Sequence, residues 1–201
     1  STSRRQRQMC IRDSFSILQL IASGYTRQGE IDGIIGKNSG PYLNNLSEGY
    51  SLIQRRLPLL SKPGTRNLRW YIADNFLNFW FRFIYPHQSA IELEKYAELN
   101  TYIKSHYVQY SGGMLEKYFR DRVAETTNVT LVGNYWDSKG ENEIDLIALN
   151  DFEKKGLVAE VKRNPDKINY TLLAQKMANL PKEFSKYSLI QKGLSLDDME
   201  M

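Results

Sequence analysis

Four charged side chains on two strand-like segments have the types and spacing needed for chemistry on a phosphate. Glu143 and Asp145 lie two residues apart in EIDLIAL, and Glu160 and Lys162 lie two residues apart in LVAEVK. Because side chains alternate across a strand, each pair is predicted to share one face, with apolar residues on the other. Charged groups on otherwise apolar strands are costly unless they bind a cation or pair with each other.

Two adjacent carboxylates beside an ammonium group suit metal-assisted hydrolysis of phosphodiesters. Asp145 and Glu160, with Glu143 beside them, are predicted to hold Mg²⁺ through oxygen ligands. A bound Mg²⁺ acidifies water and neutralises phosphate charge, and Lys162 would orient that water and stabilise the transition state. A structural salt-bridge cluster is the alternative interpretation, and the residues alone leave both open.

A hairpin of the two segments with Asp145 opposite Glu160 would place these groups together. With Asp145 opposite Glu160, Leu149 lies opposite Gly156, and the charged groups gather on one patch of one face. The remaining elements of this half are predicted as a helix over 113–126, strands at 129–132 and 134–136, and a helix over 171–184. This order indicates an α/β fold.

The helix over 113–126 carries one more acidic candidate. Glu116 lies in GGMLEKYFR, and we expect it to approach the two strands as a further catalytic carboxylate. Arg120 follows it by four residues, so an ordinary ion pair along the helix is the alternative.

The first half of the chain has the pattern of a winged helix-turn-helix. Helices are predicted over 13–23, 26–36 and 41–49, followed by strands at 52–57 and 68–72 around the turn SKPGT. DNA contact is predicted from the third helix and the wing, through Asn44, Asn45, Arg55, Arg56, Lys62 and Arg66. Docking of a protein is the alternative, because modules of this kind also bind proteins.

An aromatic segment closes the first half. Asp74 is predicted to cap a helix in which Phe76, Phe79, Trp80 and Phe83 form one buried apolar face. The domains expected are therefore a winged helix with this aromatic helix at 1–85, a helical connector at 86–110 and a nuclease-like domain at 111–201.

Charge divides the chain in the same way. Residues 1–85 contain 12 Lys and Arg against 5 Asp and Glu, whereas residues 86–201 contain 15 against 18. A basic half attracts polyanions, which makes DNA the expected partner.

The acidic and basic pattern of the second half resembles the PD-(D/E)xK nuclease superfamily. Its hallmark is an acidic residue on one strand and (D/E)-x-K on the next, here Asp145 and Glu160-Val-Lys162. The resemblance implies a restriction-endonuclease-like α/β domain, a Glu on the first core helix, and a polar residue on the helix after the hallmark strand, Gln175 or Lys176. Ile144 stands where the superfamily has Pro.

The span from about 15 to 176 is also similar to the C-terminal region of archaeal-type AAA+ ATPases. There, a winged helix and a nuclease-like domain of unknown function (family 234) follow the ATPase module. The resemblance lies in IQRRLP, YIADNFLNFWFRF, ENEIDLIALN and VAEVKRN, with Asn75 in place of the usual Pro. It implies an upstream ATPase domain that binds ATP. This chain has no P-loop, because position 31 is Ile where the motif around Gly36-Lys37 needs Gly.

We therefore expect the C-terminal fragment of a P-loop ATPase that binds DNA and hydrolyses phosphodiesters with Mg²⁺. A non-catalytic DNA- or protein-docking regulatory module is the alternative. The chain begins without Met and shows neither a secretory signal nor an apolar run of membrane-helix length. With one Cys in 201 residues, it cannot form an internal disulfide, and a cytoplasmic location is expected.

Overall fold

The computed structural model describes residues 4–199, with side chains from residue 11 onward. Contacts divide it into two compact units. The first contains the residues up to Arg56 and Leu68–Ser105, and the second contains Leu57–Asn67 and the residues from His106. The loop Leu57–Asn67 was predicted as the tip of a wing in the first domain, but its contacts place it in the second unit.

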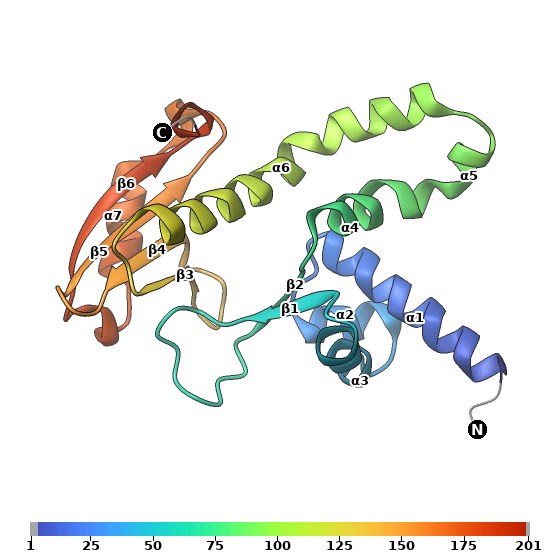
Figure 1. Ribbon diagram of the computed structural model, residues 1–201, viewed down its shortest axis with the longest axis horizontal. Helices are drawn as coiled ribbons and strands as arrows, with labels where there is room; N and C mark the ends of the chain where they lie inside the picture. Colours follow the sequence, from blue (N-terminus) through green and yellow to red (C-terminus); the bar gives the residue numbers. More distant parts are fainter. Residues whose placement is uncertain (1–3, 200–201) are drawn as a thin grey trace. The chain divides into compact units, whose positions relative to one another are not determined.

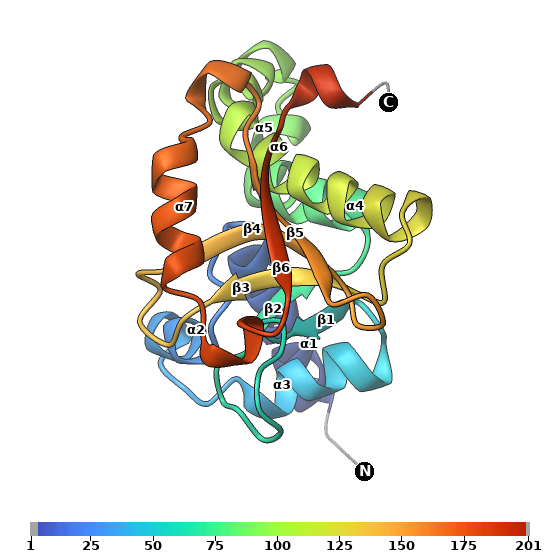
Figure 2. The same cartoon turned by 90° about the vertical axis from the view of Figure 1, so that its left-hand side faces the viewer.

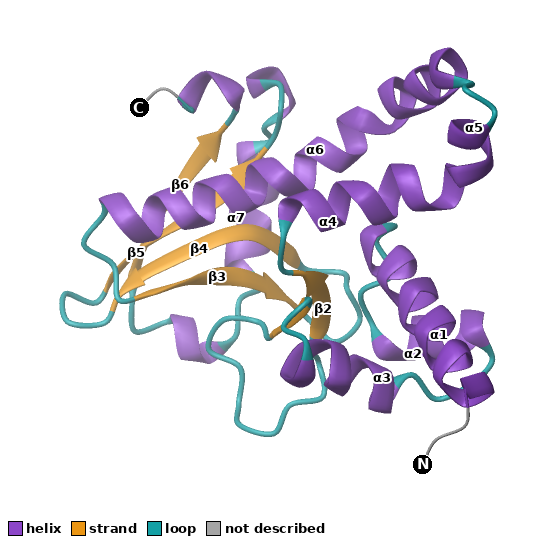
Figure 3. Ribbon diagram, turned by 45° about the vertical axis from the view of Figure 1, so that its right-hand side comes forward, coloured by secondary structure: helices purple, strands orange, loops and turns teal. Residues whose placement is uncertain are grey.

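The first unit begins with three helices and a two-stranded antiparallel sheet, the order predicted from the sequence (Figure 3). Its first helix begins well before the predicted cap at residue 13, and the third ends in a π-helical turn. The elements are α1 (Arg4–Ala22), α2 (Gln28–Ile35), α3 (Gly40–Asn44), η1 (Asn45–Gly49), β1 (Ile53–Arg56) and β2 (Arg69–Ile72).

An apolar core holds these elements together. Ile17, Leu18 and Ile31 are fully buried, and Trp70 of β2 packs in the same cluster. Gly36 ends α2 in the left-handed conformation at φ 71°, which a glycine adopts without steric cost. Of the residues that the helical spacing predicts to face the core, Leu18 and Ile31 are buried, whereas Phe15 and Ile34 are exposed.

The aromatic segment forms α4 (Asn75–Phe79), the π-helical turn η2 (Trp80–Ile84) and η3 (Tyr85–His87), followed by α5 (Gln88–Glu92). The carboxylate of Asp74 caps α4 by accepting the backbone N–H of Leu77 at 2.8 Å. The predicted buried face is right for Phe83, which is fully buried, but wrong for Phe76 and Trp80, which are 68% and 37% exposed, and Phe81 is buried without having been predicted. The wider π-helical turn breaks the 3.6-residue spacing on which the prediction depended.

The second unit is built on a four-stranded mixed sheet in the order β3-β4-β5-β6. The first three strands are antiparallel, and β6 lies parallel to β5. The elements are α6 (Tyr96–Thr126), β3 (Leu131–Trp136), β4 (Glu143–Asn150), β5 (Lys155–Val161), η4 (Pro165–Lys167), α7 (Tyr170–Ala178), η5 (Lys182–Phe184), β6 (Ser188–Leu194) and η6 (Leu196–Asp198).

The sheet lies between two helices (Figures 1 and 2). Leu115 and Phe119 of α6 pack with Leu146 and Ala148 on one face. Leu173 of α7 packs with the apolar side chains of the other face. The mixed α/β class is confirmed; α7 is shorter than the helix predicted over 171–184, and the edge strand β6 was not predicted.

The pairing of β4 with β5 follows the predicted register. Leu149 lies opposite Gly156, and Leu146 lies opposite Ala159. A methyl group on Gly156 would lie 2.5 Å from a methyl carbon of Leu149, so only glycine fits there without movement of a neighbour.

A β-bulge interrupts β4 at Asp145. The register with β3 shifts by one residue, so that Asp145 and Leu146 both lie opposite Asn134. The side-chain amide of Asn134 donates to the carbonyl of Asp145 at 2.7 Å. Ile144 consequently packs on the α7 side while Leu146 packs on the α6 side. Uninterrupted alternation through this segment was predicted, and the bulge corrects that prediction.

Candidate functional site

The charged cluster lies where β4 and β5 stop pairing with each other. Their ladder extends to Leu146 and Ala159, so Asp145 and Glu160 stand just beyond its end. There, Oδ2 of Asp145 accepts the backbone N–H of Val161 at 2.9 Å. Beyond the end of the ladder, the Asp145 side chain thus accepts a hydrogen bond from the backbone of β5. β-Bulges commonly redirect a side chain close to a functional site.

Two lysine ammonium groups form ion pairs with the carboxylates of Asp145 and Glu160. Nζ of Lys162 lies 2.6 Å from Oε1 of Glu160 and 3.5 Å from Oδ2 of Asp145. Nζ of Lys176, from α7, lies 2.9 Å from Oε2 of Glu160. The Glu160 side chain is only 8% exposed, and each of its oxygens contacts an ammonium group. The structure therefore brings Asp145, Glu160 and Lys162 together around one point.

The two carboxylates differ in proton affinity. Burial raises the pKa of Asp145, and the hydrogen bond from the N–H of Val161 and the charge of Lys162 offset this effect only in part. Burial acts in the same direction on Glu160, but the hydrogen bonds from Lys162 and Lys176 outweigh it and lower the pKa. Glu160 is therefore a stabilised anion, whereas burial disfavours the ionised form of Asp145.

Glu116 approaches this cluster from α6. It is half-buried, and within residues 4–199 its carboxyl makes no hydrogen bond or salt bridge. Burial, followed by the negative charge of Asp145, raises the pKa of Glu116 to about 7. The charge of Arg120 acts in the opposite direction but does not restore the usual value. Glu143, the other predicted ligand, is exposed at the start of β4 and also raises this pKa.

No three acidic, histidine or cysteine side chains within the described part of the chain form a ready-made metal cage.

The predicted DNA-contacting residues are mostly exposed. Asn44 and Asn45 lie where α3 continues into η1, and Arg55 is exposed on β1. The guanidinium of Arg56 lies 4.5 Å from the centre of the Tyr71 ring. The other two predicted residues, Lys62 and Arg66, are exposed on the loop of the second unit.

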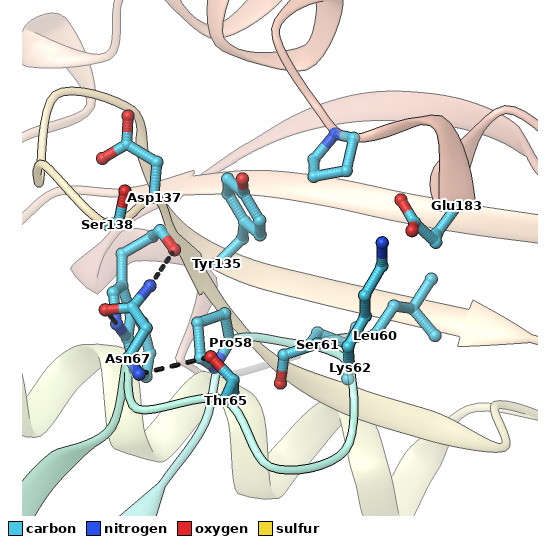
Figure 4. A pocket seen from close by; sticks show the side chains of 13 residues that line it. Pro58, Leu60, Ser61, Lys62, Thr65, Asn67, Tyr135, Asp137, Ser138 and Glu183 are labelled. Atoms are coloured by element: carbon cyan, nitrogen blue, oxygen red, sulfur yellow. Dashed lines mark hydrogen bonds between the residues drawn. The ribbon is translucent and has the colours of Figure 1, made fainter.

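That loop is tied to the end of β3. The side chain of Asn67 donates to the carbonyl of Trp136 at 3.2 Å and accepts from its indole N–H at 3.1 Å. A pocket of about 370 Å³ lies beside these contacts, between the loop, the end of β3 and η5 (Figure 4). Lys62 extends toward the side of the pocket where Glu183 lies (Figure 4).

Two residues near the cluster were not found from the sequence. Ser111 is buried on α6, and its hydroxyl accepts a hydrogen bond from the guanidinium of Arg163. Arg163 directly follows Lys162, but Ser111 lies 52 positions away, so no local motif joins the pair.

Comparison with known proteins finds a family model that matches the segment containing the cluster. Residues 80–177 match DUF234, described as archaeal and bacterial proteins of unknown function, in agreement with the predicted resemblance to family 234. An uncharacterized protein of Methanocaldococcus jannaschii is 41% identical over 156 residues, which cover 73% of this chain and 34% of that protein.

The chain thus spans about a third of the relative that it matches. No solved structure matches the chain with significance. None of the described helices combines the length and apolar character needed to cross a bilayer. Every residue of the charged cluster lies within the segment that resembles DUF234.

Proposed function

We propose that the second unit hydrolyses phosphodiester bonds in DNA with the help of Mg²⁺. The observation that carries this proposal is the position of the Lys162 ammonium between Asp145 and Glu160, with Glu116 close by on α6. The resemblance to the PD-(D/E)xK superfamily supports it, because the same residue types occupy the hallmark positions. The order of helix, antiparallel strands and helix agrees with that resemblance.

The carboxylates fit a divalent cation. Glu116 has no hydrogen-bond or ion-pair partner in the described chain, and the negative charge nearby makes its own ionisation unfavourable. Asp145 uses Oδ2 in its hydrogen bonds and keeps Oδ1 for another partner. These two side chains would hold Mg²⁺, because both oxygens of Glu160, a predicted ligand, already contact lysines. Carboxylate oxygens are the ligands that Mg²⁺ prefers.

Each residue of the cluster would then have a distinct role in the hydrolysis. When bound, Mg²⁺ makes water acidic and neutralises phosphate charge. Lys162 presents an ammonium group beside Asp145, where it would stabilise charge that develops on the phosphate. Glu160 positions Lys162, and Lys176 neutralises the second oxygen of Glu160, which keeps that carboxylate anionic.

Cleavage of plasmid and oligonucleotide DNA tests the proposal. Cleavage should require Mg²⁺ or Mn²⁺ and stop with EDTA, and Ca²⁺ should bind without supporting turnover. Asp145→Asn should abolish cleavage, and Lys162→Ala should slow it on the order of 10²–10³-fold. The matched controls are Asp166→Asn and Lys155→Ala, which change exposed residues of the same types. Equal activity in Asp145→Asn and the wild type would refute the proposal.

One observation favours a second function, a non-catalytic module that docks DNA or a protein partner. Two lysines contact Glu160, and one of them also contacts Asp145, so these two carboxylates and two ammonium groups balance in charge without any metal. A protein that folds normally but neither cleaves DNA nor binds Mn²⁺ would support the docking module.

We also propose that DNA binding by the first unit serves an ATPase module elsewhere in the same protein. The resemblance to archaeal-type ATPases supports this, as does the length of the Methanocaldococcus jannaschii relative, of which the chain covers 34%. The DNA sequence that encodes the rest of the protein tests it, since a P-loop motif should occur there.

A further inference from the structure

One positive charge near the cluster is not neutralised by the protein. Lys162 and Lys176 both contact Glu160, so their charges are balanced by carboxylates. Arg163 directly follows Lys162, is half-buried, and makes no ion pair within residues 4–199. Partial burial of an unpaired guanidinium is costly, and an anionic ligand would offset that cost.

The guanidinium is nevertheless held in a defined position. Its Nη1 donates to the hydroxyl of Ser111, which is only 8% exposed. Its central carbon lies 5.8 Å from the centre of the Tyr107 ring, within cation–π range. One hydrogen bond uses one of the five N–H donors of Arg163, so the others remain for a ligand.

The surroundings of Arg163 show which ligand it would meet. Arg163 is adjacent in sequence to Lys162, and Ser111 precedes Glu116 on α6 by five residues, roughly 7–8 Å along the helix axis. The guanidinium is therefore held against α6, the helix from which Glu116 approaches the proposed cleavage site. A planar guanidinium with several donors matches the oxygens of a phosphate.

We propose that Arg163 binds a phosphate of the DNA strand next to the one that is cleaved, and that Ser111 and Tyr107 position it. This inference rests on the proposed function, because it assigns a substrate contact to the same site. Arg163 is a substrate-binding residue, and Ser111 is a positioning residue that acts through it.

Measuring DNA binding without metal tests the contact of Arg163 with phosphate separately from cleavage. The full chain is mixed with a fluorescein-labelled oligonucleotide, as a single strand or a hairpin duplex, in EDTA at several salt concentrations. Arg163→Ala should weaken binding about tenfold, which corresponds to about 1.4 kcal/mol. It should also lower the slope of log affinity against log salt by about 0.7–0.9, the effect of one lost phosphate contact.

Three further variants make the result specific. Arg163→Lys should restore the salt slope but only part of the affinity, because an ammonium carries the charge without the planar fork. Ser111→Ala should weaken binding and leave the slope nearly unchanged, since the charge remains. Arg122→Ala removes one exposed arginine from α6 and should alter neither quantity. Thermal melting of each variant shows that it is folded.

The outcomes distinguish this inference from the proposed function. Wild-type binding and cleavage combined with unchanged affinity and slope in folded Arg163→Ala would overturn the inference alone. A wild-type protein that binds neither oligonucleotide would overturn both. Equal losses in Arg163→Ala and Arg122→Ala would also contradict it, because that result indicates a general effect of charge.

Discussion

The two units place their charges in opposite ways. In the first unit, Asp13, whose side chain is 18% exposed, forms an ion pair with the more exposed Lys37, and Arg55 is exposed on β1, while the core is apolar. In the second unit, Glu160 is buried at the end of the sheet and Glu116 is half-buried beside it. Surface charges are inexpensive and remain available to a partner, whereas buried charges are retained at a cost in stability.

The carboxyl groups of the two units also differ in their pKa shifts. The hydrogen bond from Lys37 lowers the pKa of Asp13, which is therefore stabilised as an anion. Burial raises the pKa of Asp145 and of Glu116, which are destabilised as anions. Burial is the largest cause of both upward shifts, so the second unit holds two carboxyls whose ionised form is costly. A bound cation would offset that cost.

Removal of one acidic group from each unit should give the largest difference in the free energy of unfolding. Glu160→Gln leaves two lysines without their buried counter-ion, and we expect it to lower the free energy of unfolding by about 3 kcal/mol. Asp13→Asn breaks a surface ion pair and should cost less than about 1 kcal/mol. Urea denaturation of the two variants measures this, and equal losses would remove the distinction between the units.

The pH dependence of stability should depend on Glu116. Folding raises its pKa from 4.5 to about 7, so the folded state binds the proton more tightly than the unfolded state. The free energy of unfolding should therefore fall as pH rises from about 4.5 to about 7.

Glu116→Gln stays neutral and should remove that fall, with a gain of about 1–3 kcal/mol at pH 8. Urea denaturation between pH 4.5 and 8 measures it in wild type and variant. Glu125→Gln, which changes an exposed residue of the same helix, is the matched control. Parallel stability curves for Glu116→Gln and the wild type would contradict the assignment.

The basic residues of β1 and of the loop 57–67 should matter for binding more than for stability. Replacement of Arg55, Arg56 and Arg66 by alanine should weaken binding of duplex DNA about tenfold or more, and should flatten its dependence on salt. The melting temperature should change little. Anisotropy titrations at several salt concentrations measure the effect, and unchanged binding by the triple variant would exclude these arginines from the interface.

Much of the site was predictable because it depends on local rules. The register of β4 on β5 followed from pairing charged with charged positions, and it agrees with the observed pair of Leu149 and Gly156. The cap at Asp74 followed from the preference of aspartate for helix N-termini.

Other features depend on contacts distant in sequence. The bulge at Asp145 arises from pairing with Asn134 on another strand, and strict alternation cannot show it. β6 is an edge strand with several exposed polar residues, so its pattern is weak. The π-helical turn at Trp80–Ile84 changes the helical spacing after Phe79, and Phe81 is buried although regular spacing did not predict it.

The central claim is that the acidic cluster of the second unit binds a divalent cation, and calorimetric titration of the full chain with Mn²⁺ tests it most directly. We expect a single binding event at pH 8 that weakens at pH 5.5, where Glu116 is protonated, since a protonated carboxyl is a poor ligand. Asp145→Asn should weaken binding at least tenfold, while Asp166→Asn should bind like the wild type. A folded wild-type protein that gives no binding heat at several temperatures, and no rise in melting temperature with Mn²⁺, would contradict the account.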